Sequence, residues 1–190
     1  MTIGTSTGGL NILHEIIPRF HKLDSYVIFI IQHTTQEVED PLIEQLDEKC
    51  HIRVKKAGHG MHIEPGNAYF LPADYHAGVE EQDGRVSIRL YEGTKVNFVR
   101  PSIDVFMESV AKLFRENAIG VLLTGMGRDG AQGMKAIKEA GGATIAQNEE
   151  TAPIFRMPSS AIMLGCVDKV LPPQEIFTEI MDIINKRGGT

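Results

Sequence analysis

The sequence predicts an α/β protein with a doubly wound, mostly parallel sheet, helices on both faces and an added antiparallel hairpin. Short apolar runs alternate with amphipathic stretches along the chain, which is the order expected of βαβ units. The run YVIFII at residues 26–31 is apolar throughout, as strands buried on both faces are. Asp83 and Gly84 lie between two strand-like segments and form a favoured hairpin turn.

The first third of the chain predicts three strands and two helices. The segment LNILHEIIPRF at 10–20 has apolar residues at helical spacing, and Pro18 is expected to end that helix. The predicted elements are a strand at 2–5, this helix, a strand at 26–31, a helix at 41–49 and a short strand at 51–56.

The middle of the chain predicts the antiparallel part and one long helix. NAYFLP at 67–72 is strand-like, and the segment 76–91 forms a hairpin around the Asp-Gly turn, which we expect to be attached to the sheet. In the segment 100–117, Ser102 is a suitable N-cap. The apolar residues that follow lie on one helical face, namely Ile103, Phe106, Val110 and Leu113.

The last third returns to alternating strands and helices. A strand at 119–124 is followed by the glycine-rich loop 125–130 and by a helix that Gly141 and Gly142 close. The remaining predicted elements are a strand at 143–147, a loop at 149–158, a short helix at 159–164 and a terminal helix at 175–186.

Composition narrows the class of protein. The 190 residues suffice for one α/β domain, and a net charge of −6 disfavours a general nucleic-acid binder. Cys50 and Cys166 have no CxxC spacing, which disfavours a disulfide scaffold and a zinc ribbon. The sequence contains neither the roughly 18 unbroken apolar residues of a membrane span nor a signal peptide. We therefore expect a cytoplasmic protein that does not insert into membranes.

Three chemically active residues follow three predicted strands. Ser6 comes after the first strand, His33 after the strand at 26–31, and Asp129 lies in the loop after the strand at 119–124. Because ligands bind beyond the carboxyl ends of parallel strands, we expect a serine, a histidine and an aspartate at one edge of the sheet. The order Ser–His–Asp differs from that of the α/β-hydrolases, and geometry rather than order defines a triad.

Each of these residues also has an alternative interpretation. The segment GTSTG around Ser6 matches GxSxG, which favours a nucleophile, but a plain turn or an anion-binding loop is also compatible with it. His33 can serve as a hydrogen-bonding histidine at a strand end, and Asp129 as the N-cap of the helix that follows it. His59 and His62 are three residues apart, but no further ligand is evident, so we expect no metal site.

Six segments in a fixed order resemble the catalytic domain of the CheB family, the chemotaxis protein-glutamate methylesterases and deamidases. These segments are GTSTGGL, IIQHT, IEPGNAYFLPADYH, RPSIDVFMESVA, VLLTGMGRDGAQGM and LGCVDKVLP. The resemblance covers nearly the whole chain. It implies a catalytic triad of Ser6, His33 and Asp129 that hydrolyses glutamyl methyl esters on chemoreceptor helices and converts certain glutamines to glutamate.

The resemblance also implies how the chain is organised. Members of the family typically carry an N-terminal receiver domain, whereas the first motif here begins at residue 4. We therefore expect residues 1–190 to be a single methylesterase catalytic domain for signal transduction, with no receiver domain in this chain. The expected partners are membrane-bound methyl-accepting receptors, and neither a cofactor nor a nucleic acid is needed.

Further site residues follow from the expected mechanism. Backbone N–H groups at Thr7, Gly8 and Met126 are candidates for stabilising the oxyanion. The loop 151–158 should border the site, where Phe155, Arg156 and Met157 could contact a receptor helix, with Arg156 meeting its carboxylates. A non-catalytic anion-binding module and a general carboxylesterase are the two rival functions.

Overall fold

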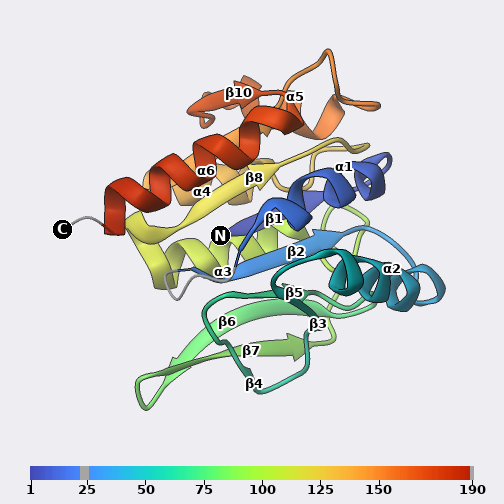
Figure 1. Ribbon diagram of the computed structural model, residues 1–190, viewed down its shortest axis with the longest axis vertical. Helices are drawn as coiled ribbons and strands as arrows, with labels where there is room; N and C mark the ends of the chain where they lie inside the picture. Colours follow the sequence, from blue (N-terminus) through green and yellow to red (C-terminus); the bar gives the residue numbers. More distant parts are fainter. Residues whose placement is uncertain (22–25, 189–190) are drawn as a thin grey trace.

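The computed structural model describes residues 1–21 and 26–188, which form a seven-stranded parallel sheet, a smaller antiparallel sheet and six α-helices (Figure 1). The parallel sheet has the strand order β10-β9-β8-β1-β2-β5-β3. Its strands are β1 (Thr2–Thr5), β2 (Ile28–Gln32), β3 (Arg53–Lys56), β5 (Asn67–Phe70), β8 (Ile119–Leu122), β9 (Ala143–Gln147) and β10 (Lys169–Leu171). The strands after β1 are added on one side of it, beginning with β2, and from β8 onward they are added on its other side. The switch point of the doubly wound sheet therefore lies between β1 and β8.

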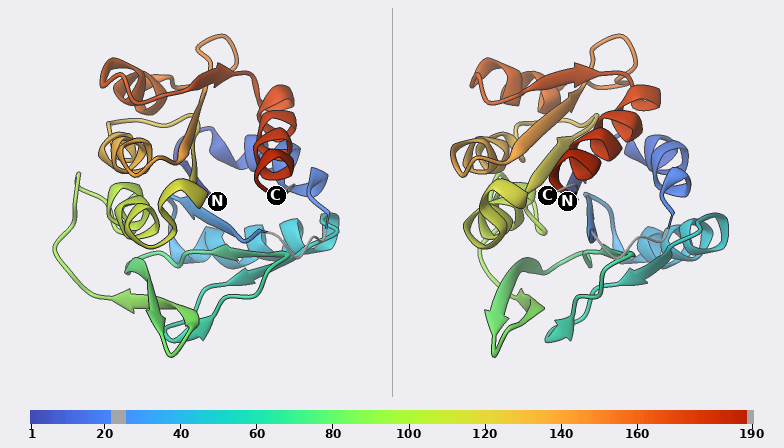
Figure 2. Two further views of the ribbon diagram at one scale, coloured as in Figure 1. Left: turned by 90° about the vertical axis from the view of Figure 1, so that its left-hand side faces the viewer. Right: turned by 60° about the vertical axis from the view of Figure 1, so that its left-hand side comes forward.

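Helices cover both faces of this sheet (Figure 2). Helices α1 (Gly9–Ile16), α2 (Gln36–Lys49) and α6 (Pro173–Gly188) share one apolar core with the sheet. Helices α3 (Ile103–Phe114), α4 (Ala131–Glu139) and α5 (Arg156–Met163) share the other. Successive side chains of a strand point to opposite faces, so β2 places Ile28 and Ile30 in the first core and Phe29 and Ile31 in the second. This explains why its sequence is apolar without interruption.

The predicted hairpin is present, but it is not an extension of the main sheet. Strands β6 (His76–Gln82) and β7 (Arg85–Tyr91) pair around the Asp83-Gly84 turn and form a separate sheet with β4 (Met61–His62). Ala77 and Ile88 are buried with α3, and Val79 N–H donates to Ser109 Oγ of that helix at 3.1 Å. The hairpin thus lies against α3 because its apolar side chains are buried there.

Two predicted helix starts were wrong, because each helix includes the proline at which the sequence pattern suggests a boundary. Helix α2 begins at Gln36 and contains Pro41 in its interior. Its first turn is held from outside, since the Glu39 carboxylate accepts from Ala73 N–H at 2.5 Å and pairs with Lys56. Helix α5 begins at Arg156 rather than at residue 159, with Pro158 in its first turn, where a missing N–H costs little.

The other elements follow the predictions closely. Strand β9 has the expected bounds, and Ser102 is the N-cap of α3, where its side chain accepts from Val105 N–H. The short edge strand β10 and the two-residue β4 were not predicted. Within residues 1–21 and 26–188, no helix has both the length and the apolar character that a membrane span requires.

Candidate active site

Ser6 and His33 lie next to each other at the carboxyl edge of the sheet. Thr5 and Gln32, the last residues of β1 and β2, are partners in the parallel register. His33 N–H extends this pairing by donating to Thr5 O at 3.1 Å. The Gln32 side-chain amide donates to both Ser6 O, at 3.0 Å, and His33 O, at 2.9 Å, so it ties the two segments together just beyond the strands.

His33 and Asp129 are in hydrogen-bond contact, although 96 positions separate them in the sequence. His33 Nε2 lies 3.0 Å from Asp129 Oδ2, and the two side chains are only 11 % and 3 % exposed. An ionised carboxylate can only accept, so Nε2 carries the hydrogen of this bond. In the neutral ring, Nδ1 is then the nitrogen with a free lone pair.

The Asp129 carboxylate is bound by the start of α3. Oδ2 accepts from Ile103 N–H at 2.6 Å, and Oδ1 accepts from Ser102 Oγ at 2.7 Å and from Asp104 N–H at 3.4 Å. Burial alone would raise the pKa of Asp129, but hydrogen bonds from His33, Asn97, Ser102 and Ile103 lower it overall. The carboxylate is therefore ionised at neutral pH.

The alternative that Asp129 caps the helix following it is wrong, although Asp129 does bind the start of another helix. Helix α4, which follows Asp129, has Gly130 as its N-cap and no capping side chain. Asp129 instead accepts from the first N–H groups of α3, beside that helix's N-cap Ser102, and the positive end of α3 faces the carboxylate. One side chain thus both caps a helix and contacts a histidine, two roles that the sequence presents as alternatives.

Asn97 also belongs to this cluster, although the sequence pattern did not indicate it. Its amide donates to Asp129 Oδ1 at 2.9 Å and to Asp104 Oδ2 at 2.8 Å, while Arg128 Nε donates to its oxygen at 3.3 Å. Burial, with the neighbouring Asp129 charge, raises the pKa of Asp104 although hydrogen bonds from Gly133 and Asn97 oppose this. The amide therefore separates two buried carboxylates. The sequence holds only one weak sign, since Asn is a residue that tolerates positive φ and Asn97 has φ 52°.

The turn around Ser6 depends on close backbone packing. Gly8 precedes α1 with φ 85°, a conformation that favours glycine. On the other side, a Cβ on Gly125 would lie 2.7 Å from Ser6 Cβ and 2.1 Å from Met157 Sδ, so any side chain there would collide. In the described part of the chain the Ser6 hydroxyl makes no hydrogen bond to His33, and such contacts are often loose before substrate binds.

The N–H groups expected to stabilise an oxyanion are available. Within residues 1–21 and 26–188, the backbone N–H groups of Thr7, Gly8 and Met126 have no hydrogen-bond acceptor. Thr7 and Met126 are exposed, beside the half-buried Ser6 and the buried Gly125 respectively. The site thus combines a hydroxyl, an imidazole with a bound carboxylate and unpaired N–H donors, which is the set of groups that acyl transfer requires.

The loop 151–158 borders the Ser6 turn, as expected from the position of β9. Ile154 O accepts from Gly125 N–H at 2.9 Å, and Pro153 lies 2.9 Å from where a Gly8 Cβ would be. Arg156 is exposed at the start of α5, and Phe155 is half-buried. The expectation that Met157 could contact a partner is wrong, because its side chain is fully buried against Gly125.

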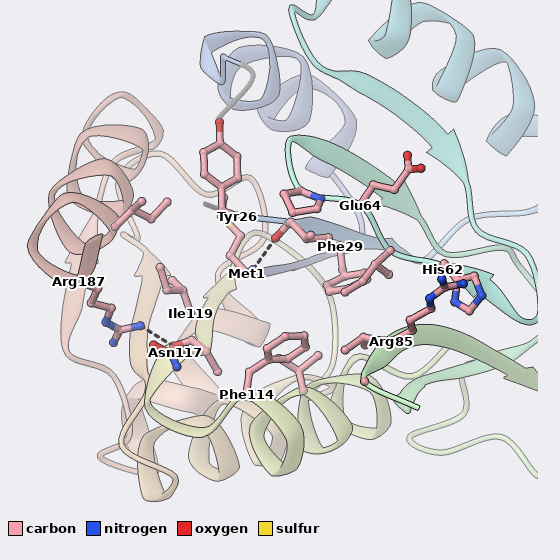
Figure 3. A pocket seen from close by; sticks show the side chains of 18 residues that line it. Met1, Tyr26, Phe29, His62, Glu64, Arg85, Phe114, Asn117, Ile119 and Arg187 are labelled. Atoms are coloured by element: carbon pink, nitrogen blue, oxygen red, sulfur yellow. Dashed lines mark hydrogen bonds between the residues drawn. The ribbon is translucent and has the colours of Figure 1, made fainter. Parts of the chain in front are cut away.

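A hollow of about 770 Å³ lies at the amino edge of the sheet, opposite the edge that carries Ser6 and His33 (Figure 3). Met1, Val27 and Ile119, which line it, stand at the amino ends of β1, β2 and β8. The Met1 amine donates to Val27 O at 2.6 Å, and burial with the nearby Arg187 charge lowers its pKa to about 5. Ser6, His33 and Asp129 do not line this hollow, so its size gives no argument about their chemistry.

Metal binding finds no support in the described ranges. They contain no group of three or more His, Cys, Asp or Glu side chains that could hold a metal ion. Of the closely spaced His59 and His62, the first contacts the backbone: its Nδ1 lies 3.2 Å from Leu90 N and 3.0 Å from Leu90 O.

Comparison with known proteins gives a consistent result. The family model described as CheB methylesterase matches residues 1–180. Proteins named protein-glutamate methylesterase/protein-glutamine glutaminase are 41 % identical over 188 residues in Methanococcus maripaludis and 44 % identical over 183 residues in Carboxydothermus hydrogenoformans. These alignments cover 98 % and 95 % of this chain but 51 % and 54 % of the relatives, so the chain spans about half their length.

A solved structure matches at the level of the whole fold. The crystal structure of the Thermotoga maritima CheB methylesterase catalytic domain superposes with a TM-score of 0.92 at 37 % identity, over 97 % of this chain and 96 % of that one. The parallel sheet, the helices on both faces and the smaller antiparallel sheet therefore form a known arrangement.

Proposed function

The chain belongs to the CheB methylesterase family, and on that premise we propose that it is a serine hydrolase acting on glutamyl methyl esters of chemotaxis receptors. The same chemistry would deamidate receptor glutamines, as the full names of the relatives suggest. Ser6, His33 and Asp129 form the catalytic triad, and residues 1–190 act as one catalytic domain. The function is exercised in the cytoplasm, at membrane-bound receptors.

One observation carries the proposal. His33 is adjacent to Ser6 through the β1–β2 register and holds Asp129 through Nε2 at 3.0 Å. A buried carboxylate that fixes the imidazole, with a serine directly after the neighbouring strand, supports the arrangement of a serine hydrolase. An anion-binding loop would need the free N–H groups beside Ser6, but it would not need the His33–Asp129 pair.

The reaction follows from which ring nitrogen is free. Ser6 Oγ attacks the ester carbonyl while His33 Nδ1 accepts the hydroxyl proton, and Asp129 stabilises the imidazolium through Nε2–H. The tetrahedral intermediate collapses as His33 returns the proton to departing methanol, or to ammonia when the substrate is glutamine. Water activated by His33 then cleaves the acyl-enzyme. General acid–base help of this kind contributes about 10²- to 10⁴-fold.

The oxyanion is stabilised by backbone donors. The N–H groups of Thr7, Gly8 and Met126 are unpaired within the described residues. Thr7 and Gly8 follow Ser6, and Met126 follows Gly125, which packs against Ser6. The N-terminus of α1 adds a favourable dipole. A single such donor is typically responsible for about 10²- to 10³-fold of the rate. Arg156, exposed on the same edge, contacts carboxylates of the receptor.

The decisive experiment measures methanol release from methylated receptor membranes by the wild-type chain and by Ser6→Ala. The wild type should release methanol and Ser6→Ala should stay at background. A fluorophosphonate probe should label Ser6 in the wild type. Absence of labelling and of methanol release would favour a binding module, whereas hydrolysis of small esters without receptor demethylation would favour a general carboxylesterase.

A further inference from the structure

Next to the proposed triad lies a second hollow, of about 370 Å³, between the start of α4 and the end of α5. The two helices are neighbours (Figure 2). Asn97 and Arg128 line the hollow on one side, and Met163 and Leu164 on another. Met163 is 78 % exposed and Leu164 43 %. Because Asn97 also hydrogen-bonds Asp129, the hollow adjoins the cluster that holds the catalytic carboxylate.

The turn beside this hollow displays an aromatic ring. Val96 and Val99 pair through reciprocal backbone hydrogen bonds of 3.2 and 3.0 Å, which closes a two-residue turn of Asn97 and Phe98. Both residues have positive φ, 52° and 67°, as in a type I′ turn. The Phe98 side chain is 94 % exposed.

Folding does not explain a phenylalanine at this place. The second position of such a turn is normally glycine, because a bulky side chain is disfavoured at positive φ. The exposed ring also leaves its apolar surface in water. An exposed ring in an unfavourable backbone conformation, near a hollow lined by the exposed Met163 and Leu164, is a feature typical of a site that recognises a partner.

The backbone turn that carries Phe98 is tied to the proposed triad. Asn97, the residue before Phe98, donates to both Asp129 and Asp104 and accepts from Arg128. The turn therefore cannot shift without breaking contacts to the catalytic carboxylate. Phe98 is presented from a rigid support, as interface anchor residues are.

The charges of the hollow limit what it can bind. Asp104 is buried, and its oxygens accept from Gly133 N–H and from Asn97. Among the described lining residues, the exposed charge is that of Arg128. Flexible methionine side chains adapt to apolar partners. The surface thus suits an element with an apolar side chain and a neighbouring carboxylate, which is the pattern of an acidic amphipathic helix.

We propose that Phe98, Met163, Leu164 and Arg128 form a docking surface for an acidic amphipathic helix of the protein substrate. The helix places one apolar side chain in the hollow beside Phe98 and one carboxylate at Arg128, while the reacting glutamyl group reaches Ser6. This inference rests on the proposed function. It adds the requirement that the enzyme also recognise parts of the substrate helix other than the reacting glutamyl group.

The test uses Phe98→Gly, because glycine fits φ 67° and the variant should be at least as stable as the wild type. In a Ser6→Ala background, fluorescence anisotropy measures binding of a labelled 20-residue acidic amphipathic helical peptide with one γ-methyl glutamate. Phe98→Gly and Met163→Glu should each raise the dissociation constant about tenfold or more. Phe98→Leu and Met163→Lys should retain most of the affinity, and Val38→Ala, an exposed apolar position on α2, is the matched control.

Kinetics with Ser6 present separate docking from chemistry. The ratio of kcat/KM for the peptide to that for N-acetylglutamate γ-methyl ester amide should fall about tenfold in Phe98→Gly, through KM. Equal losses on both substrates, or unchanged peptide binding in Phe98→Gly and Met163→Glu, would overturn the docking surface. Failure of the wild type to hydrolyse either ester would instead contradict the proposed function, while the anisotropy measurement still decides the docking surface.

Discussion

His33 contacts Asp129 through Nε2, 3.0 Å from Oδ2, which leaves Nδ1 as the ring nitrogen with a free lone pair. In the serine protease template the carboxylate holds Nδ1 and the serine contacts Nε2. The proposed triad reverses these roles. Asp129, at the start of α3, takes Nε2, the ring nitrogen farther from the backbone, and Nδ1 is left for Ser6, which follows the neighbouring strand.

Asp129→Asn should reduce kcat by about 10³- to 10⁴-fold, because the neutral amide no longer secures the tautomer or stabilises the imidazolium. It should also lower the free energy of unfolding by about 1–3 kcal/mol, since the carboxylate accepts from Ile103 N–H and Ser102 Oγ. Methyl-ester turnover and urea unfolding measure the two effects. Loss of stability with a wild-type kcat would leave Asp129 only as the cap of α3.

Acid should remove the stability that Asp129 contributes. Its pKa is lowered in the folded protein, against burial, by hydrogen bonds from His33, Asn97, Ser102 and Ile103. A carboxyl whose pKa is depressed on folding stabilises the fold above its unfolded pKa, about 3.9, and this contribution is lost as the pH falls through the folded value. The difference in unfolding free energy between wild type and Asp129→Asn should therefore shrink below about pH 4.

Asp104 gives the matched contrast to this pH effect. Burial and the Asp129 charge raise its pKa in the folded state. Folding therefore favours its protonated form, and its contribution becomes less favourable as the pH rises above its unfolded pKa. The difference in unfolding free energy between the wild type and Asp104→Asn should therefore change with pH in the direction opposite to the difference for Asp129→Asn. If both differences change with pH in the same direction, this assignment is refuted.

Gly125→Ala should reduce both activity and stability, because the added methyl group would lie 2.7 Å from Ser6 Cβ and 2.1 Å from Met157 Sδ. Overpacking of this kind costs about 1–3 kcal/mol. Adding Met157→Ala should relieve the second collision but leave the Ser6 turn displaced, so stability should recover more than kcat does. Gly58→Ala is the control, since its nearest atom is Met61 Cε at 3.5 Å. An active, stable Gly125→Ala protein would mean that the Ser6 turn tolerates a side chain.

Asn97→Gly should lower kcat about tenfold, because it removes the amide between two buried carboxylates while keeping the backbone free to adopt φ 52°. Asn97→Asp should have a larger effect, since it adds a third negative charge to the cluster. The kcat profile against pH distinguishes this positioning role from a loss of folding. An unaltered pH profile and kcat in Asn97→Gly would show that Ser102 and Ile103 suffice to hold Asp129.

The fold could be predicted where its signal is local. The apolar run of β2, the Asp83-Gly84 turn and the Ser102 cap depend on neighbouring residues alone, and each lies where the sequence indicates it. The starts of α2 and α5 could not be predicted, because Pro41 and Pro158 suggest boundaries. Pro158 is tolerated because it lies in the first turn of α5, whereas the turn before Pro41 is held by a contact distant in sequence, the bond from Ala73 N–H to Glu39.

The site shows the same division. The sequence by itself determined that Ser6 and His33 come directly after two buried strands and that Asp129 lies in the loop after a third, because hydrophobic periodicity and the placement of glycines are properties of consecutive residues. Only the tertiary structure decided that Asp129 caps α3, contacts Nε2 and shares Asn97 with Asp104. These hydrogen bonds join segments that are distant along the chain, and their geometry is set by how the helices lie on the sheet, which no local pattern encodes.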